Sequence, residues 1–491
     1  TRYLPQDGGT PRLRVDVAHV SAFRQVVGRH WGNAAPGNDH TIKVAATGLE
    51  PGRWYHYRFV APDGAVSPRG RTRTLPGRGT GPFRIAVLSC ANMDFGYFNA
   101  YRHLAQRTDI DLVLHLGDYI YEWGNGAHSL AALALKDRVS RPAHETVTLD
   151  DYRTRYAWYR ADPDLAEMHR MFPVISIVDD HEITNNAWVN GAGNHQPNEG
   201  SYAVRKAAAM KAYHEWLPMP DMPYDRYDIG DLAAIFRLET RLVGRDEPLD
   251  LGDAIAGAAD PFKAMAAFRD GPLQDPKRTL MGSAQERWLA DGMRNSVRAG
   301  QRWQVAAQQA VMGPHRLPET AVGWSSQKPA PGSRAALRQM GALAASKAGL
   351  PLGFDNWNGY PAARARLLGA AQAAGANLVV LSGDSHNAWA YDLAQDGRPA
   401  GVEFAGQSVA SFGFEARFDA DPKRIAQDMV AANPALKWCD TSRRGYMTVT
   451  LSRDEARNDW LFLETVKTRS TALSGKSTAA VGFGERRLQL A

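Results

Sequence analysis

The sequence predicts an α/β protein with a small β-sandwich at its N-terminus. Its 491 residues are too many for one ordinary hydrophobic core, so we expect two domains, one of them large. The first part of the chain alternates apolar and polar residues with period two, whereas the later part sets strand-sized apolar runs between helical or loop stretches. We therefore expect a β-sandwich over residues 1–78 and an α/β domain over residues 79–491.

The N-terminal domain is predicted from short strands joined by Gly/Pro turns. In "WYHYRFV", which begins at residue 54, Tyr55, Tyr57 and Phe59 share one face, and the intervening residues share the other. A turn at Asp63-Gly64 follows, and similar short segments lie on either side. The segment 75–82, "LPGRGTGP", is the predicted linker. The alternative is that these strands extend the main sheet.

Four apolar runs of the second domain end in polar residues. The runs are "FRIAVLSCAN", "DIDLVLHLGDYIY", "FPVISIVDDHE" and "ANLVVLSGDSHN". A single Asp after a strand commonly caps a helix or forms a turn, but four such ends together indicate a site, because ligands bind at the carboxyl ends of strands in open α/β sheets. The residues at these ends are Cys90, Asp118, Asp179, Asp180, His181, Asp384 and His386.

This collection of acidic groups indicates bound metal ions. So much negative charge beside an apolar sheet is costly unless cations neutralise it. Carboxylates favour hard ions such as calcium, magnesium, manganese or ferric iron, whereas a thiolate and a phenolate on one centre, from Cys90 and Tyr121, favour a strongly acidic, redox-capable metal such as iron. We therefore expect two unlike metal sites.

Composition argues against several other classes of protein. Hydrophobic residues make up 44% and charged residues 22%, which fits a folded globular chain. The net charge is +6, but the basic residues are scattered along the chain, so we predict no specific nucleic-acid reader. We expect no membrane span, because no run reaches about 18 apolar residues. The only cysteines, Cys90 and Cys439, are too few for a disulfide framework, and "GDSHNAW" lacks the Gly-x-Ser-x-Gly of a serine hydrolase.

The motifs "SCAN", "GDYIYE", "DDHEITNN" and "SGDSH" occur in this order at residues 89, 117, 179 and 382. Together they resemble the PhoD-like alkaline phosphatase family of calcineurin-type metallophosphoesterases. The resemblance covers nearly the whole chain, including the stretches 151–182 and 354–368. It implies a four-layer αββα metallophosphoesterase sandwich with a fibronectin/Ig-like β-sandwich before it. The chain departs from the family pattern at Val178, Glu239 and Asn358, none of which is a proposed ligand.

The resemblance implies an iron site and a second, harder site. Asp118 would bridge the two metals, which suits a carboxylate because it has two oxygens. Cys90, Tyr121 and His386 would complete the Fe³⁺ site, since phenolate and thiolate stabilise a higher-valent ion.

The second site takes its ligands from two other motifs. By the resemblance, Asp180 and Asp384 would hold Ca²⁺, with Mn, Mg or Zn as alternatives there. Either Asn185 or Asn186 would supply a neutral oxygen.

Two further residues are expected to face the substrate. His181 directly follows a proposed ligand, and the family's relatives place a histidine there beside the substrate, where it would protonate the leaving oxygen. The alternative is a histidine with a structural hydrogen bond. Asn92 would donate to a phosphate oxygen, or else it only shapes the turn after its strand.

The sequence therefore predicts a metal-dependent phosphoric ester hydrolase, an alkaline phosphatase acting on small phosphomonoesters, phosphodiesters or both. A metal-activated water would attack phosphorus in line, without a covalent phosphoenzyme. The alternatives are a phospholipase D-like phosphodiesterase on the same fold and a catalytically inactive, metal-containing surface-binding protein. The resemblance implies a periplasmic or secreted location, and a start at Thr1 without an apolar signal segment is expected of a processed or shortened chain.

Overall fold

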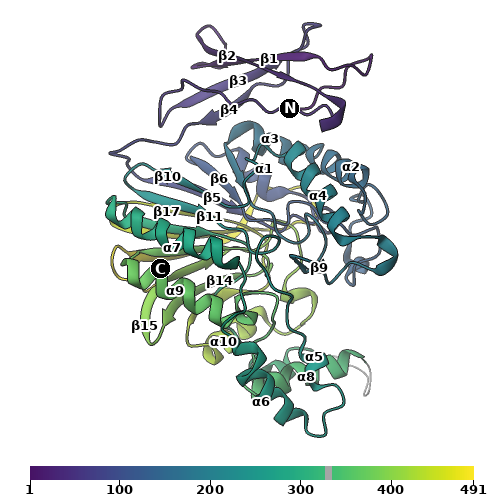
Figure 1. Ribbon diagram of the computed structural model, residues 1–491, viewed down its shortest axis with the longest axis vertical. Helices are drawn as coiled ribbons and strands as arrows, with labels where there is room; N and C mark the ends of the chain where they lie inside the picture. Colours follow the sequence, from purple (N-terminus) through teal and green to yellow (C-terminus); the bar gives the residue numbers. More distant parts are fainter. Residues whose placement is uncertain (327–333, 491) are drawn as a thin grey trace.

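The computed structural model describes residues 1–326 and 334–490 (Figure 1). A small β-sheet unit lies at one end of the molecule, a large α/β unit fills the middle, and a small helical lobe lies at the other end. The last strand of the first unit ends at Arg73 and the first strand of the second begins at Phe83, so residues 74–82 connect the two.

The N-terminal unit is an antiparallel sheet with the strand order β2-β1-β3-β4. Tyr55 is buried in one cluster with Val15 and Val17 on one face, as the alternation predicts. The layer over that face is the segment 41–49, which, among the described residues, contributes one isolated bridge from Thr41 to Arg2. The second layer is irregular because "AATGLEPG" is poor in strand-forming residues. The strands are β1 (Arg12–Ala18), β2 (Val26–Asn33), β3 (Trp54–Val60) and β4 (Gly70–Arg73).

Strand β4 joins this sheet to the α/β unit. Arg71 donates from Nε to the carbonyl oxygen of Met171 at 3.2 Å, and its guanidinium lies over the ring of Phe172. Arg73 forms an ion pair with Asp111, the residue before β6 (Leu112–His115). The sheet therefore contacts the α/β unit through its edge strand β4, and the opposite edge strand β2 lies farthest away (Figure 1).

Two seven-stranded sheets face each other in the α/β unit. The first has the order β20-β19-β18-β17-β5-β6-β7 and the second the order β10-β11-β12-β13-β15-β14-β16. Strands β5, β6 and β7 are parallel, as are β11, β12, β13 and β15, so their carboxyl ends lie on one side. The first sheet contains β5 (Phe83–Leu88), β6 (Leu112–His115), β7 (Val174–Ser176), β17 (Gly445–Leu451), β18 (Glu455–Leu463), β19 (Leu473–Gly482) and β20 (Gln489–Leu490). The second contains β10 (Asp225–Ile229), β11 (Ala233–Arg237), β12 (Trp303–Ala307), β13 (Leu378–Ser382), β14 (Ala388–Gln395), β15 (Arg398–Ala405) and β16 (Leu436–Asp440).

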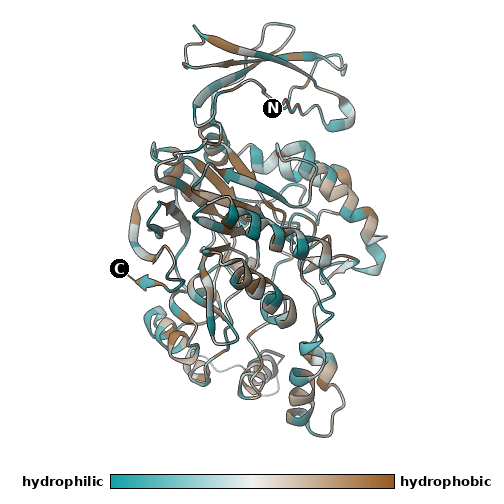
Figure 2. Ribbon diagram, turned by 60° about the vertical axis from the view of Figure 1, so that its left-hand side comes forward, coloured by the Kyte–Doolittle hydropathy of each residue, from teal (hydrophilic) through white to brown (hydrophobic). Residues whose placement is uncertain are grey.

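Helices cover the outer faces of both sheets and complete four layers (Figure 1). One buried cluster joins the two sheets, with Val87 and Met447 from the first and Val305 and Val379 from the second. The central strands are coloured as hydrophobic in Figure 2, whereas the helices carry hydrophilic residues outside. The first sheet is covered by α1 (Asn99–Ala105), α2 (Leu149–Arg160), α3 (Pro163–Met171) and α4 (Tyr202–Trp216), the second by α7 (Gly282–Arg298), α9 (Pro361–Ala374) and α10 (Pro422–Ala432).

Local sequence signals set several helix starts. Asp162 accepts hydrogen bonds from the backbone at the start of α3, and Pro163 takes the first helical position. The same Asp-Pro arrangement begins α10 and α6. The helical lobe consists of α5 (Leu251–Ile255), α6 (Pro261–Asp270) and α8 (Arg334–Lys347), and the short hairpin β8 (Ala187–Trp188) and β9 (Gly191–Ala192) lies beside α4. None of the described helices combines the length and apolar composition needed to cross a bilayer.

Candidate metal centre

The polar strand ends of the two sheets meet at one place. Close approach depends on two glycines, because a Cβ at Gly117 would lie 2.4 Å from Cβ of Asp179, and one at Gly383 would lie 2.5 Å from Oγ of Ser89. Gly117 also has a φ of 102°, which other residues rarely adopt. These glycines let the ends of β5, β6 and β13 and the segment after β7 share one small volume.

The backbone is strained at five non-glycine residues of this region. Each has a left-handed conformation, which costs about 1 to 3 kcal/mol and persists only where the surroundings enforce it. Strain of this kind collects at functional sites, so its concentration here marks the centre independently of side-chain chemistry. The residues are Cys90 (φ 60°), Asp118 (54°), Asn186 (56°), Asp384 (59°) and His386 (62°).

The first group of potential ligands combines three of the predicted residues. Ligand atoms of Cys90, Asp118 and His386 all lie within 4.8 Å of one another. The hydroxyl of Tyr121 donates to Oδ2 of Asp118 at 2.9 Å and lies 3.3 Å from Nε2 of His386. The structure thus brings together all four residues expected at the iron site.

The orientation of His386 suits a ligand. Its Nδ1 lies 2.7 Å from the carbonyl oxygen of Phe412, which accepts the ring proton and leaves the lone pair of Nε2 facing Asp118 and Tyr121. Burial lowers the pKa of His386 to about 3, so the imidazole is neutral at ordinary pH. A neutral, oriented imidazole is the form that binds a metal.

The second group lies beside the first. Asp179, Asp180 and Asp384 have ligand atoms within 4.8 Å of one another, and so do Asp118, Asp180 and His181. Asp118 therefore belongs to the first group and also adjoins the second, as a bridging carboxylate must.

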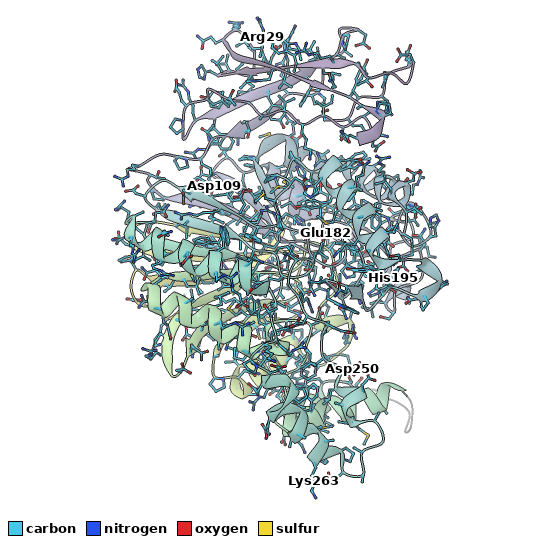
Figure 3. The ribbon with its side chains drawn as sticks, in the orientation of Figure 1. Arg29, Asp109, Glu182, His195, Asp250 and Lys263 are labelled. Atoms are coloured by element: carbon cyan, nitrogen blue, oxygen red, sulfur yellow. The ribbon has the colours of Figure 1, made fainter. Side chains whose placement is uncertain are left out.

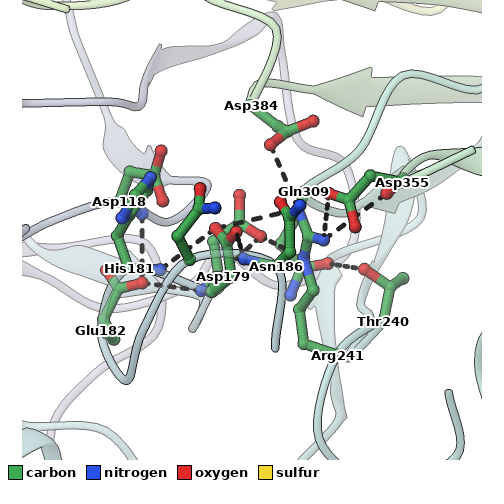
Figure 4. A network of polar contacts seen from close by, with 12 residues as sticks. Asp118, Asp179, His181, Glu182, Asn186, Thr240, Arg241, Gln309, Asp355 and Asp384 are labelled. Atoms are coloured by element: carbon green, nitrogen blue, oxygen red, sulfur yellow. Dashed lines mark hydrogen bonds and ion pairs between the residues drawn. The ribbon is translucent and has the colours of Figure 1, made fainter. Parts of the chain in front are cut away.

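The two asparagines of the "DDHEITNN" motif are held differently. The backbone N–H of Asn186 donates to Oδ2 of Asp180 at 2.6 Å. That of Asn185 donates to Oε1 of Glu122 at 2.8 Å. Figure 4 draws Asn186 within the polar network around Asp179.

Arg241 supplies positive charge to the acidic cluster (Figure 4). Its fully buried guanidinium lies 2.6 Å from Asp179, 3.1 Å from Asp384 and 2.7 Å from Asp355. Asp355 also pairs with Arg245. Buried Glu239 accepts from the backbone N–H groups of residues 241, 242 and 243 and fixes the loop that carries Arg241.

His181 is held by Glu122. Its Nδ1 lies 2.6 Å from Oε2 of Glu122, and its ring stacks on Tyr121 with 4.2 Å between centroids. Burial lowers the pKa of His181, but Glu122, Asp118 and Asp180 outweigh it and raise the pKa well above the usual value. The protonated imidazole is therefore stabilised.

The charge pattern of the centre fits cations. Burial and then neighbouring carboxylates raise the pKa of Asp118 well above the usual value, and burial with Asp118 does the same for the pKa values of Cys90 and Tyr121. Oδ1 of Asp118 and Oδ2 of Asp179 are buried without a hydrogen-bond partner among the described residues. Acidic groups that lie so close together resist ionisation unless a cation balances their charge. Their raised pKa values and the unpaired carboxylate oxygens are therefore consistent with a site built to bind metal ions.

Asn92 lies at the edge of this region. Its Oδ1 accepts from the backbone N–H of Asp94 at 3.1 Å, which is the turn-forming role considered as the alternative. The residue also lines a small cavity of about 20 Å³ with Tyr121, Trp123 and His128. Contact with a substrate stays a prediction.

Sequence reasoning missed four charged residues of the centre: Glu122, Glu182, Arg241 and Asp355. Glu182, labelled in Figure 3, accepts from the backbone N–H groups of Asp118 and Asp179 at 3.1 and 2.8 Å and so joins two ligand-bearing loops. The signal was present for Glu122 and Glu182, because both lie within quoted motifs, directly after Tyr121 and His181. Asp355 lies in the family-like stretch 354–368, whereas Arg241 gave no such signal.

Comparison with known proteins gives the family. The sequence profile of the PhoD-like phosphatase matches residues 85–460, and that of the PhoD-like phosphatase N-terminal domain matches residues 1–76. The chain belongs to the PhoD-like phosphatase family. It is 31% identical over 502 residues to alkaline phosphatase D of Bacillus subtilis (strain 168), covering 97% of this chain and 77% of that protein.

A solved structure agrees with this assignment. The structure described as "Structure of PhoD" matches with a TM-score of 0.78 and 28% identity over 100% of this chain and 88% of the other. The predicted family and fold class, an α/β phosphatase with an N-terminal β domain, are confirmed. Membership of the PhoD-like phosphatases supports hydrolysis of phosphoric esters and the presence of metals.

Proposed function

We propose that this PhoD-like phosphatase hydrolyses small phosphate esters, monoesters or diesters, at the candidate metal centre. The observation that carries the proposal is the convergence of carboxylate, thiol, phenol and imidazole groups from the ends of β5, β6 and β13 and the segment after β7. Two buried carboxylate oxygens among them have no hydrogen-bond partner in the described part of the chain. Cations held by such ligands supply an activated water as nucleophile and offset charge on the phosphoryl oxygens.

We assign Fe³⁺ to the group of Cys90, Asp118, Tyr121 and His386. The phenol and thiol are the reason, since both favour a strongly acidic ion. The hydroxyl of Ser411, 2.7 Å from that of Tyr121, can donate to the phenolate when the proton leaves.

We assign Ca²⁺ to Asp118, Asp180 and Asp384, because these are hard oxygen ligands. Asn186 is the more suitable of the two asparagines, since its backbone is fastened to Asp180. We also propose that the protein is periplasmic or secreted, where proteins commonly bind Ca²⁺.

His181 is the proposed general acid. Glu122 accepts from Nδ1, so a second proton at Nε2 is available for the leaving alcohol. Asn92 is proposed to steady a phosphate oxygen. We also propose that residues 1–78 and 79–491 are separate domains.

The deciding experiment combines elemental analysis of the purified protein with hydrolysis rates for a phosphomonoester, a simple diester and a phospholipid. We expect iron and calcium together with turnover of the monoester or the simple diester. Metals without turnover of any ester would favour an inactive binding protein, and phospholipid as the preferred substrate would favour the phospholipase D-like alternative. Turnover without metals would overturn the proposed chemistry.

A further inference from the structure

The positive charge of the protein resides in its N-terminal unit. Residues 1–78 contain 12 Arg and Lys against 5 Asp and Glu, a net charge of +7. Because the whole chain carries +6, residues 79–491 carry −1. Such asymmetry between parts of a chain is typical of a unit that meets an anionic partner.

Strand pairing gathers much of this charge on one face of the sheet. Arg14 of β1 pairs with Trp31 of β2, and Asp16 pairs with Arg29 on one side and Arg58 on the other. Directly paired residues share a face, and so do residues two apart on one strand. We call the surface formed by Arg12, Arg14, Arg29, Trp31 and Arg58 the arginine face.

One carboxylate organises the arginine face without neutralising it. The carboxylate of buried Asp16 lies 2.8 Å from Nε of Arg14 and 3.1 Å from the guanidinium of Arg58. It lies 3.8 Å from the guanidinium of Arg29. Three guanidinium groups around one carboxylate leave a surplus of positive charge and unused N–H groups. Arg12 adds a further charge and lies over the ring of Trp31 at 5.5 Å.

The arginine face is open to solvent. The side chain of Arg29 is 61% exposed, and Trp31 is 50% exposed. Figure 3 labels Arg29 at the end of the molecule farthest from the helical lobe, on the strand remote from the α/β unit. About half of the surface of Trp31 is therefore free to meet a ligand, although Arg12 lies over its ring.

We propose that the arginine face binds single-stranded nucleic acid without sequence preference. Guanidinium groups form bidentate hydrogen bonds with phosphate oxygens. An exposed aromatic ring can stack on any of the bases. Adjacent strands lie about 4.8 Å apart and alternate residues of one strand about 6.7 Å apart, so the long arginine side chains on them can reach several phosphates of one extended strand.

This surface is separate from the metal centre, and the inference does not rest on the proposed function. Arg73 of β4 contacts Asp111 just before β6, whereas the metal centre lies beyond the far end of β6, at Asp118. The arginine face therefore tethers a polymer to the protein and contributes no group to hydrolysis.

The test measures binding by the intact, metal-loaded protein. The probe is a fluorescein-labelled oligothymidylate of about 20 nucleotides, longer than the roughly 4 to 16 that one small β domain covers. Fluorescence anisotropy is read at several salt concentrations, and a denaturing gel verifies that the probe stays intact. The variant is Arg12→Gln/Arg29→Gln, which leaves the two closest partners of Asp16 in place.

The matched control is Arg287→Gln/Arg298→Gln, two exposed arginines of α7. Both double variants lower the net charge equally. We expect the arginine-face variant to bind the probe at least tenfold more weakly than the unaltered protein does. The slope of log affinity against log salt concentration should decrease in magnitude by about 1.4, because two phosphate contacts are lost and each contributes about 0.7. The control should keep the slope of the unaltered protein. Absence of binding, or equal losses in the two variants, would overturn the proposal.

Trp31→Ala separates nucleic acid from other polyanions. It should weaken binding of the oligothymidylate by about 5- to 150-fold, the range of one base–aromatic stack, and leave binding of inorganic polyphosphate unchanged. Equal losses for both polymers would refute recognition of nucleic acid. Circular dichroism and the rate of monoester hydrolysis should be unchanged in every variant, because none of these residues belongs to the metal centre.

Discussion

His181 and Glu122 form a buried pair in which Nδ1 of the imidazole lies 2.6 Å from Oε2 of the carboxylate. Glu122 also accepts from the backbone N–H of Asn185 and from the side chain of Asn194, so it cannot easily turn away from the ring. The pair holds the imidazole beside Asp118 and Asp180, since one ligand atom from each of the three residues lies within 4.8 Å of the others. It thereby distinguishes His181 from a histidine that only packs.

His181→Ala tests the general acid. We expect a loss of about 10² to 10⁴-fold in rate on an alkyl phosphate, the usual contribution of a positioned acid, and a much smaller loss on a nitrophenyl phosphate, whose leaving group needs little protonation. Metal content should not change. His144→Ala, at an exposed histidine, is the control. Equal slowing on both substrates would assign His181 to phosphate positioning.

Asp118→Asn tests the bridge. The amide removes the negative charge between two cations that in such sites lie about 3.5 to 4 Å apart, so both should bind poorly and activity should fall to background. Elemental analysis after gel filtration measures the loss. Asp109→Asn, at an exposed carboxylate, should keep both metals. Normal metal content with near-normal turnover would show that Asp118 only forms a turn.

Tyr121→Phe tests the identity of the first metal. If Tyr121 binds Fe³⁺, phenolate-to-iron charge transfer should colour the concentrated protein, and the band should weaken or vanish in the variant. Tyr119→Phe is a close control, since that buried tyrosine bonds to His169 instead. A colourless, iron-free and fully active protein would contradict the assignment.

Acid stability should depend on His115. Burial lowers the pKa of His115 to about 3, against about 6.5 in the unfolded chain, so the unfolded state binds the extra proton between these values. The free energy of unfolding is therefore not reduced by this group above pH 6.5, and it falls as the pH decreases toward 3. The reduction is about 2 kcal/mol at about pH 5.

Urea unfolding of the chelated protein and of His115→Gln, each at about pH 7 and pH 5, measures this effect. The variant should lose less stability between the two pH values, because it lacks the titrating ring. Parallel losses would show that other groups carry the acid sensitivity.

The strand ends could be predicted from the sequence because each combines a local signal with a general rule. An apolar run that stops at Asp118 or Asp384 is visible in a short window, and parallel strands deliver their carboxyl ends to one edge. The same logic located Cys90 and His181. The irregular second layer of the N-terminal unit was less predictable, because residues 41–44 alternate as a strand does, whereas residues 45–52 are poor in strand-forming residues.

Other features depend on contacts between distant segments. Arg241 and Asp355 are 114 residues apart, and neither "LETR" nor "FDNW" differs from an ordinary loop. The arginine face was also hidden, because basic residues that are scattered along 78 positions become neighbours only through strand pairing. Charge distribution read along the chain therefore understated the charge density of the folded surface.

Arg241 has a consequence for how the protein acquires its ions. The chain brings its own cation to Asp179 and Asp384, so the acidic cluster is partly balanced before any metal arrives. A buried acidic cluster with a cation of its own should cost the fold less than an unpaired one when no metal is bound. An ion that binds Asp384 would replace the contact between this carboxylate and the guanidinium of Arg241.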